Sequence, residues 1–140
     1  MSIPTLPKFP RLTIFHSARN PTSRAALSML QRMGPKAEPT PFDVDVVGDS
    51  EEGASKTGTT ATPTQLRSLI GYLGFSKEPY RILVPEAPKV PDSGVNEVVS
   101  LLKRQPKWLI TPIVVDWAKG KAVIADPPEK AIPLTRNVGD

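Results

Sequence analysis

Proline restricts the fold of this chain more than any other residue does. It accounts for 17 of the 140 residues, more than twice its average usage of about 5%. Because proline has a fixed φ angle and no backbone N–H, it is excluded from helix interiors and from central strands. We therefore expect short helices and strands around a single core, joined by proline-rich connections, in a chain whose length suits one domain.

The first elements follow from the residues that lie between these prolines. The β-branched and aromatic run RLTIF at 11–15 predicts a short strand. Residues 20–34 predict a helix, because Asn20 is a good N-cap, Pro21 fits the first helical position and a Gly-Pro pair ends the run. The alternating run FDVDVV at 42–47 predicts a second strand with one buried face.

The middle of the chain contains three successive segments of different composition. Residues 48–61 contain few apolar side chains and predict a mobile loop. A helix is then expected over 62–74, where Thr62 and Gln65 have the spacing of a capping box. The prolines in 76–92 are too frequent for regular structure, so we expect this segment to run over the surface.

The last part of the chain predicts a third helix, a hairpin and one more short helix. The helix falls within 93–106, and two β-rich runs around AKGK at 111–126 predict a hairpin in which Gly120 supplies the turn. Residues 127–134 could form the final short helix. Flexible ends are expected at 1–10 and at 135–140. The resulting order, β-α-β-α-α-β-β-α, predicts one α/β thioredoxin-like domain with a mixed four-stranded sheet flanked by helices.

Several kinds of chemistry are excluded by composition. The chain has no cysteine and one histidine, so disulfides, thiolate metal sites and thiol catalysis are absent and an imidazole-rich metal site is not expected. The acidic residues that could suggest a metal or paired-carboxylate site are Asp43, Asp45, Asp49, Glu51 and Glu52. Their spacing fits neither a calcium loop nor a helix pair, so we expect them at the surface and expect no metal.

Positive charge is concentrated at the start of the chain. Residues 1–37 contain six Lys or Arg side chains and no acidic one. This composition is typical of mitochondrial transit segments, and it equally suits a basic face that meets anions or nucleic acid. The longest apolar run, ITPIVVDW, is far shorter than the roughly 18–20 residues of a membrane span, so none is expected.

The segment FHSARNPTSR, at 15–24, has the layout of a loop that presents a reactive group at a helix start. A helix N-terminus carries unpaired N–H groups and partial positive charge. Thr22 and Ser23 add hydroxyl groups, and Arg19 and Arg24 add charge. Two interpretations stay open here: a site for phosphate, a carboxylate or a glutathione-like tail, or a well-capped helix with solvated arginines.

Three further positions have alternative interpretations. His16 could act as a base or an anion donor, although a histidine bonded to a backbone carbonyl is the more ordinary outcome. Thr111 and Pro112 open the hairpin, where a thioredoxin-like domain carries a cis-proline that faces the active loop. Trp117 either packs inside the hairpin or stacks on a ligand.

The loop resembles the active loop of arsenate reductases of the ArsC type. In that loop a histidine is followed four residues later by the catalytic cysteine and then by a Ser-Arg pair. His16, Ser23 and Arg24 are in register with this pattern. Asn20 stands at the position of the cysteine.

A second stretch, TPIVVDWAKGKAVIADPPE, resembles the Arg-cis-Pro-Ile-Val-Val strand of the same family and its Arg-Pro-x-Glu turn. Thr111 replaces the first of these arginines and Asp126 replaces the second. The resemblance therefore implies that the groups expected to stabilise an oxyanion are missing.

The chain is also similar to a group of redox proteins from fungal mitochondria with a thioredoxin-like fold. The similarity lies in the long loop after the second strand and in the hairpin VDW…GK at 115–121. That group is thought to reduce small toxic molecules through one cysteine on the helix before the cis-proline strand. The nearest counterpart here is Leu101 or Leu102, and neither side chain can attack a substrate.

Three hypotheses follow. The first is a non-catalytic thioredoxin-like domain of mitochondria that binds glutathione, a small anion or an extended peptide, the last by strand addition, and that needs no cofactor. The residues expected to bind are His16, Arg19, Thr22, Ser23, Arg24, Thr111 and Pro112. The second is a structural subunit of a larger mitochondrial assembly, whose basic segment clamps acidic protein or RNA surfaces; binding to free nucleic acid is not expected. The third is an oxidoreductase without a thiol, using Ser23, Thr22 and His16.

Overall fold

The computed structural model describes residues 10–37, 41–48, 61–85, 87, 94–136 and 138. Its helices and strands are β1 (Arg11–His16), α1 (Pro21–Met33), β2 (Asp43–Gly48), α2 (Pro63–Tyr72), α3 (Val95–Arg104), β3 (Ile113–Asp116) and β4 (Lys121–Ile124). Short 3-10 helices are η1 (Gly34–Lys36), η3 (Pro79–Ile82), η4 (Pro106–Trp108) and η5 (Pro128–Thr135). The expected order is therefore present, with the last helix of the 3-10 type.

The strands form one mixed sheet in the order β2-β1-β3-β4. β1 pairs with β2 in parallel and with β3 antiparallel, with Thr13 opposite Val115. β3 and β4 form the antiparallel hairpin, and its turn contains Gly120 at a φ of 66°. A parallel β-α-β half joined to an antiparallel hairpin is the predicted mixed sheet.

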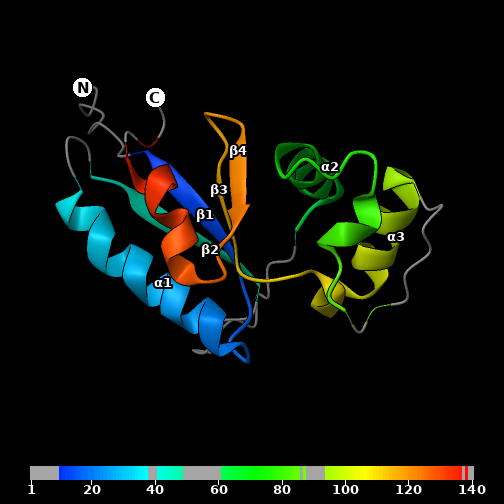
Figure 1. The fold of residues 1–140 in the computed structure, drawn as a ribbon, viewed down its shortest axis with the longest axis horizontal. Coiled ribbons are helices and arrows are strands. Elements are labelled where there is room, and N and C mark those ends of the chain that lie inside the picture. The colour runs from blue at the N-terminus through cyan, green and yellow to red at the C-terminus, as the bar shows by residue number, and fades with distance from the viewer. Residues whose placement is uncertain are drawn as a thin grey trace, which may run out of the picture.

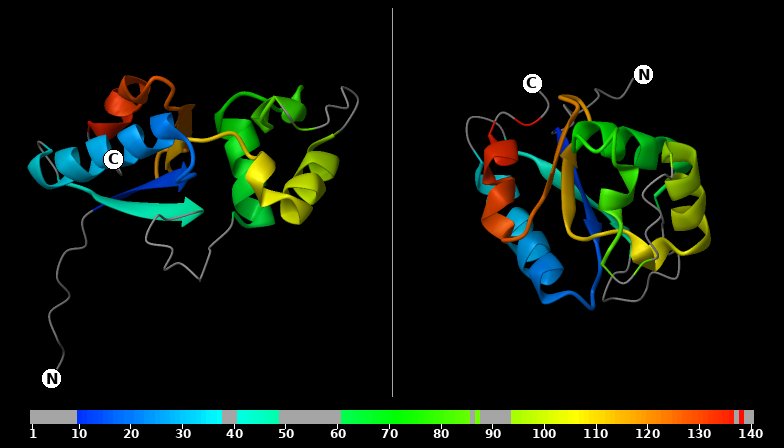
Figure 2. Two further views of the ribbon diagram at one scale, coloured as in Figure 1. Left: turned by 90° about the horizontal axis from the view of Figure 1, so that it is seen from below. Right: turned by 45° about the vertical axis from the view of Figure 1, so that its right-hand side comes forward.

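Helices cover both faces of this sheet. Figure 1 shows α1 and η5 on one side of the strands and α2 and α3 on the other, and both views in Figure 2 keep this order. The core toward α1 and η5 includes Leu12, Ile14, Leu30, Val114 and Leu134. The core toward α2 and α3 includes Phe15, Leu66, Ile70, Val98 and Ile113. Because successive strand residues point to opposite faces, the two central strands contribute to both cores and are almost completely buried.

The helix caps form as the sequence predicts. The side-chain oxygen of Asn20 accepts the backbone N–H of Thr22 at 2.9 Å and starts α1. The Thr62 hydroxyl accepts the Gln65 N–H at 3.1 Å, and the Gln65 side chain accepts the Thr62 N–H at 3.0 Å. Such caps each contribute about 1 kcal/mol, because they satisfy helix N–H groups that have no partner within the helix.

The proline-rich segment 76–92 differs from the prediction that it runs over the surface. Its short run between Pro79 and Pro85 is buried at Ile82 and Leu83. The Ile82 carbonyl accepts the N–H of Ile110 at 2.9 Å, and the Val84 N–H is donated to the Trp108 carbonyl at 2.8 Å. Prolines flank this run without interrupting it, so its apolar side chains are free to pack and its backbone is free to pair.

Some expectations fall partly or wholly outside the described residues. The flexible arm is described only at Pro10, and the loop expected at 48–61 is described only at its two ends, which excludes Asp49, Glu51 and Glu52. Within the tail expected to fray, Thr135 and Val138 are buried, so this part packs against the domain. No helix in the described parts is long and apolar enough to cross a membrane.

Candidate functional site

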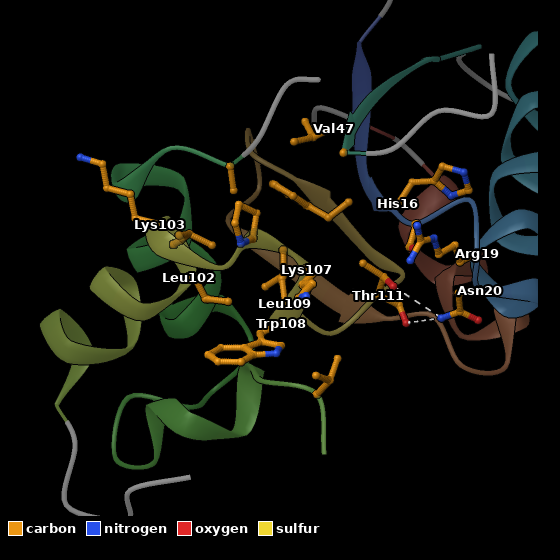
Figure 3. A pocket seen from close by; sticks show the side chains of 17 residues that line it. His16, Arg19, Asn20, Val47, Leu102, Lys103, Lys107, Trp108, Leu109 and Thr111 are labelled. Atoms are coloured by element: carbon orange, nitrogen blue, oxygen red, sulfur yellow. Dashed lines mark hydrogen bonds between the residues drawn. The ribbon is translucent and has the colours of Figure 1, made fainter. Parts of the chain in front are cut away.

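A cavity of about 740 Å³ lies where β1 and β2 end and where the α3–η4 segment approaches them. Figure 3 shows it from close by, with the loop after β1 on one side and the α3–η4 segment on the other. In open α/β sheets, ligands bind outside the carboxyl ends of the parallel strands. The position and the volume both match those of ordinary small-molecule sites, which occupy about 300–1,000 Å³.

Asn20 joins the two segments that the sequence places at this site. Its Nδ2 donates to the Thr111 carbonyl oxygen at 3.0 Å, while its Oδ1 accepts the N–H of Thr22. The Thr111–Pro112 peptide bond is cis, which is the isomer that a thioredoxin-like domain carries at this position. The loop after β1 and the start of the hairpin are therefore held side by side by one amide side chain, at the position where the resemblance would place a thiol.

His16 has a partner that was not expected from sequence. Its Nδ1 lies 2.6 Å from the Ser23 hydroxyl oxygen, which also accepts the N–H of Ser17 at 3.0 Å. His16 lines the cavity, but Ser23 does not and its side chain is fully buried. The Ser23 hydroxyl therefore fixes the histidine and the turn from inside the protein and is not presented to a substrate.

Three other predicted residues also lie outside the cavity wall. The Arg24 guanidinium donates to the Ala18 carbonyl at 2.6 Å and so stabilises the loop. Pro112 is buried, and Thr22 contributes its backbone N–H to the cap. Of the seven residues expected to bind a ligand, three line the cavity, and these are His16, Arg19 and Thr111.

The four cavity-lining residues of this loop and hairpin that the sequence singles out are thus His16, Arg19, Asn20 and Thr111. Three of them, all except Asn20, belong to the set expected to bind a ligand. Thr22, Ser23, Arg24 and Pro112 lie behind the wall and support it. Most of the side chains that hold the loop in place therefore do not line the cavity, whereas Asn20 both lines it and holds the loop.

The positions that the resemblance assigns to missing catalytic groups also differ in whether they line the cavity. Leu102 lines the cavity and is 2% exposed, whereas Leu101 is half-buried and is not part of the wall. Leu102 is therefore the better counterpart of the cysteine expected on this helix. Asp126 is exposed and does not line the cavity.

The α3–η4 segment supplies lining residues that sequence reasoning missed. They include Lys103, Lys107, Trp108 and Leu109. The run KRQPKW, which places basic and aromatic side chains after a helix end, is the signal that could have indicated them. Its relation to the loop after β1 depends on long-range packing, so the sequence alone gives no distance between them.

Among the described residues, the charged side chains of the cavity wall are all cations. Arg19, Lys103 and Lys107 are exposed, and none of the described lining residues is acidic. Within the described parts of the chain, these three side chains form no ion pair. In those same parts, no group of three or more His, Cys, Asp or Glu side chains is arranged to hold a metal ion. The wall therefore favours an anionic ligand.

Trp117 lies outside the cavity wall and packs within the domain. Its indole N–H donates to the Thr13 hydroxyl at 2.9 Å, and its ring meets Phe15 edge-on with centroids 6.2 Å apart. Tyr72 covers the other side at 6.0 Å. These contacts favour the packing interpretation of Trp117 over ligand stacking.

The fold and the position of the cavity define a single α/β domain of the thioredoxin-like class. It is similar to the structure of an arsenate reductase from Vibrio cholerae, with a TM-score of 0.67 and 19% identity over 91% of this chain and 98% of the other. It is also similar to a candidate arsenate reductase from Yersinia pestis, with a TM-score of 0.61 and 23% identity over 87% of this chain and 98% of the other.

These likenesses support a relation to the ArsC-type fold, and at such identities they concern the fold alone. No protein-family model matches the sequence, and no curated protein matches it. The chain has the backbone of these reductases without any cysteine.

Proposed function

We propose that this chain is a cysteine-free, non-catalytic thioredoxin-like domain that binds a small anionic ligand in the cavity beside Asn20 and Thr111. The observation that carries the proposal is the cavity wall, in which the described residues include three cationic side chains and no acidic one. An anion placed there meets favourable charge from Arg19 on one side and from Lys107 on the other.

Thiol chemistry has no nucleophile in this chain. The amide of Asn20 and the alkyl side chain of Leu102 occupy the positions that the resemblance assigns to cysteines, and neither group can form a thiolate. Ser23 is the remaining hydroxyl beside a histidine, but its side chain is buried behind the wall. Binding therefore explains the site better than the thiol-free oxidoreductase does.

A small ligand suits the site better than an extended peptide. Strand addition next to a cis-proline would use the backbone of the preceding residue. The carbonyl of Thr111 already accepts a hydrogen bond from Asn20 at 3.0 Å. An added strand would compete with that bond, whereas glutathione or an inorganic anion can approach the cationic side chains without breaking it.

The test is a titration of isotope-labelled protein with inorganic phosphate and with glutathione, followed by amide NMR shifts. We expect saturable shifts at residues 16–20 and 103–111. The affinity obtained from them should fall about fivefold or more in Lys107→Gln and stay unchanged in Lys77→Gln. A charged hydrogen bond worth about 1.5–3 kcal/mol gives this size of effect. The absence of saturable shifts with either ligand would show that the proposal is wrong.

We further propose that the protein works in fungal mitochondria. The basic, acid-free composition of residues 1–37 and the resemblance to the fungal mitochondrial redox group support this location. Fractionation of fungal cells that express the tagged chain should recover it with mitochondria, and recovery only in the cytosol would contradict the proposal. Migration of the recovered protein in a large complex would instead favour a structural subunit.

A further inference from the structure

The cavity has an apolar part that a small inorganic anion would leave unfilled. Trp108 and Leu109 of the α3–η4 segment line it together with Leu66 of α2 and Val47 of β2. Leu66 is 2% exposed, whereas the other three side chains are half-buried and keep part of their apolar surface open. The volume of about 740 Å³ suits a ligand of several carbon atoms rather than a single phosphate.

The charged and apolar side chains of the cavity come from two segments that lie on opposite sides of it. Arg19 extends from the loop after β1, next to Asn20 and Thr111, and Lys107 and Trp108 come from the segment across the cavity (Figure 3). A carboxylate can accept paired hydrogen bonds from a guanidinium, which gives both energy and orientation. An apolar body attached to that carboxylate would then lie against the largely apolar surface of Trp108 and Leu109.

We propose that the preferred ligand is an amphipathic carboxylate, with its head group beside Arg19 and an acyl or aryl body against Trp108 and Leu109 across the cavity. This inference rests on the proposed function, because it names the ligand class of the same cavity. Glutathione is a poorer match, since its polar groups are spread along its length and some would be buried against apolar wall without partners.

The experiment is calorimetry with straight-chain carboxylates from butanoate to dodecanoate, below their micelle concentrations, and with alcohols of matched length. We expect the Kd to fall about three- to fourfold for each methylene that becomes buried, until the apolar part is filled. The heat capacity of binding should become more negative along the series. Octanol should bind about tenfold more weakly than octanoate at low salt.

Substitutions in the cavity wall test the contributions of the ligand's head group and of its apolar body separately. Arg19→Gln should remove most of the difference between octanoate and octanol, whereas Arg32→Gln, an exposed arginine of α1 outside the wall, should leave it unchanged. Ala61→Phe adds bulk at the wall without changing its charge, so affinity should stop rising at a shorter chain. Circular dichroism shows whether each variant folds. The series of carboxylates measured on the wild-type protein tests the inference without any variant.

The outcomes distinguish this inference from the proposed function. If phosphate or glutathione binds but dodecanoate binds no more tightly than butanoate, the inference is wrong and the proposed function stands. Equal binding of octanol and octanoate would also refute the inference, because the head group would then contribute nothing. If none of the anions binds, both proposals are wrong.

Discussion

Changing Asn20 to aspartate would separate the bond that caps α1 from the bonds that the side chain donates to Thr111. Aspartate is as good an N-cap as asparagine, so the bond from the Thr22 N–H would remain. The donor to the Thr111 carbonyl, now 3.0 Å away, would be replaced by a second acceptor. The variant therefore removes the link between the loop and the hairpin while it keeps the start of α1.

The magnitude follows from these two contacts. Loss of the half-buried amide–carbonyl bond costs about 1–1.5 kcal/mol, and the added charge at the N-terminus of α1 returns about 0.3–1 kcal/mol. We therefore expect Asn20→Asp to lower the free energy of unfolding by at most about 1 kcal/mol. Asn20→Ala loses the cap as well, so it should cost about 2 kcal/mol.

Urea denaturation followed by tryptophan fluorescence measures both variants, with unchanged m-values as the check for two-state unfolding. Thr62→Ala is the control, because Thr62 caps α2 and the structure gives it no bond to the hairpin. It should cost about 1 kcal/mol, half the effect of Asn20→Ala. An Asn20→Ala variant that loses no more stability than Thr62→Ala would refute the idea that this amide holds the two segments together.

Four further substitutions test local features. Gly48→Ala should destabilise by at least about 2 kcal/mol, because its φ is 109° and an added Cβ would lie 2.4 Å from the His16 carbonyl oxygen; Gly71→Ala, with nothing within 4 Å, should stabilise α2 by about 0.5–1 kcal/mol. Ser23→Ala should cost about 1–3 kcal/mol in the same assay, because it removes a buried hydroxyl with two partners. Trp117→Phe should cost about 0.5–1.5 kcal/mol by thermal denaturation, since it removes the indole bond to β1.

Local signals in the sequence predicted the elements of the fold well. Asn20 and the Thr62–Gln65 pair act within one helical turn, and Gly120 sets its turn through its own φ angle. Features that depend on residues close in the chain can be read from composition and spacing, because no distant partner decides them. The loop and the cis-proline were also placed together, but through the fold argument rather than through any residue pattern.

The remainder of the site depends on contacts between distant parts of the chain. The pairing of Ile82 with Ile110 and of Val84 with Trp108 follows from how α2 and α3 pack, and no local rule anticipates it. The same packing brings Lys107 opposite Arg19. The contact between His16 and Ser23 was missed for a different reason: a strand followed by a helix turns the chain back, so residues seven apart can meet.

The position of β1 in the sheet has a consequence for synthesis of the chain. β1 gains its parallel partner β2 early, but its second partner lies far along the sequence, since Thr13 pairs with Val115, about 100 residues later. Until β3 has left the ribosome, β1 presents an unpaired, apolar strand edge, which is a template for pairing with other chains. The centre of the sheet therefore stays open on this side of β1 until β3 has been synthesised.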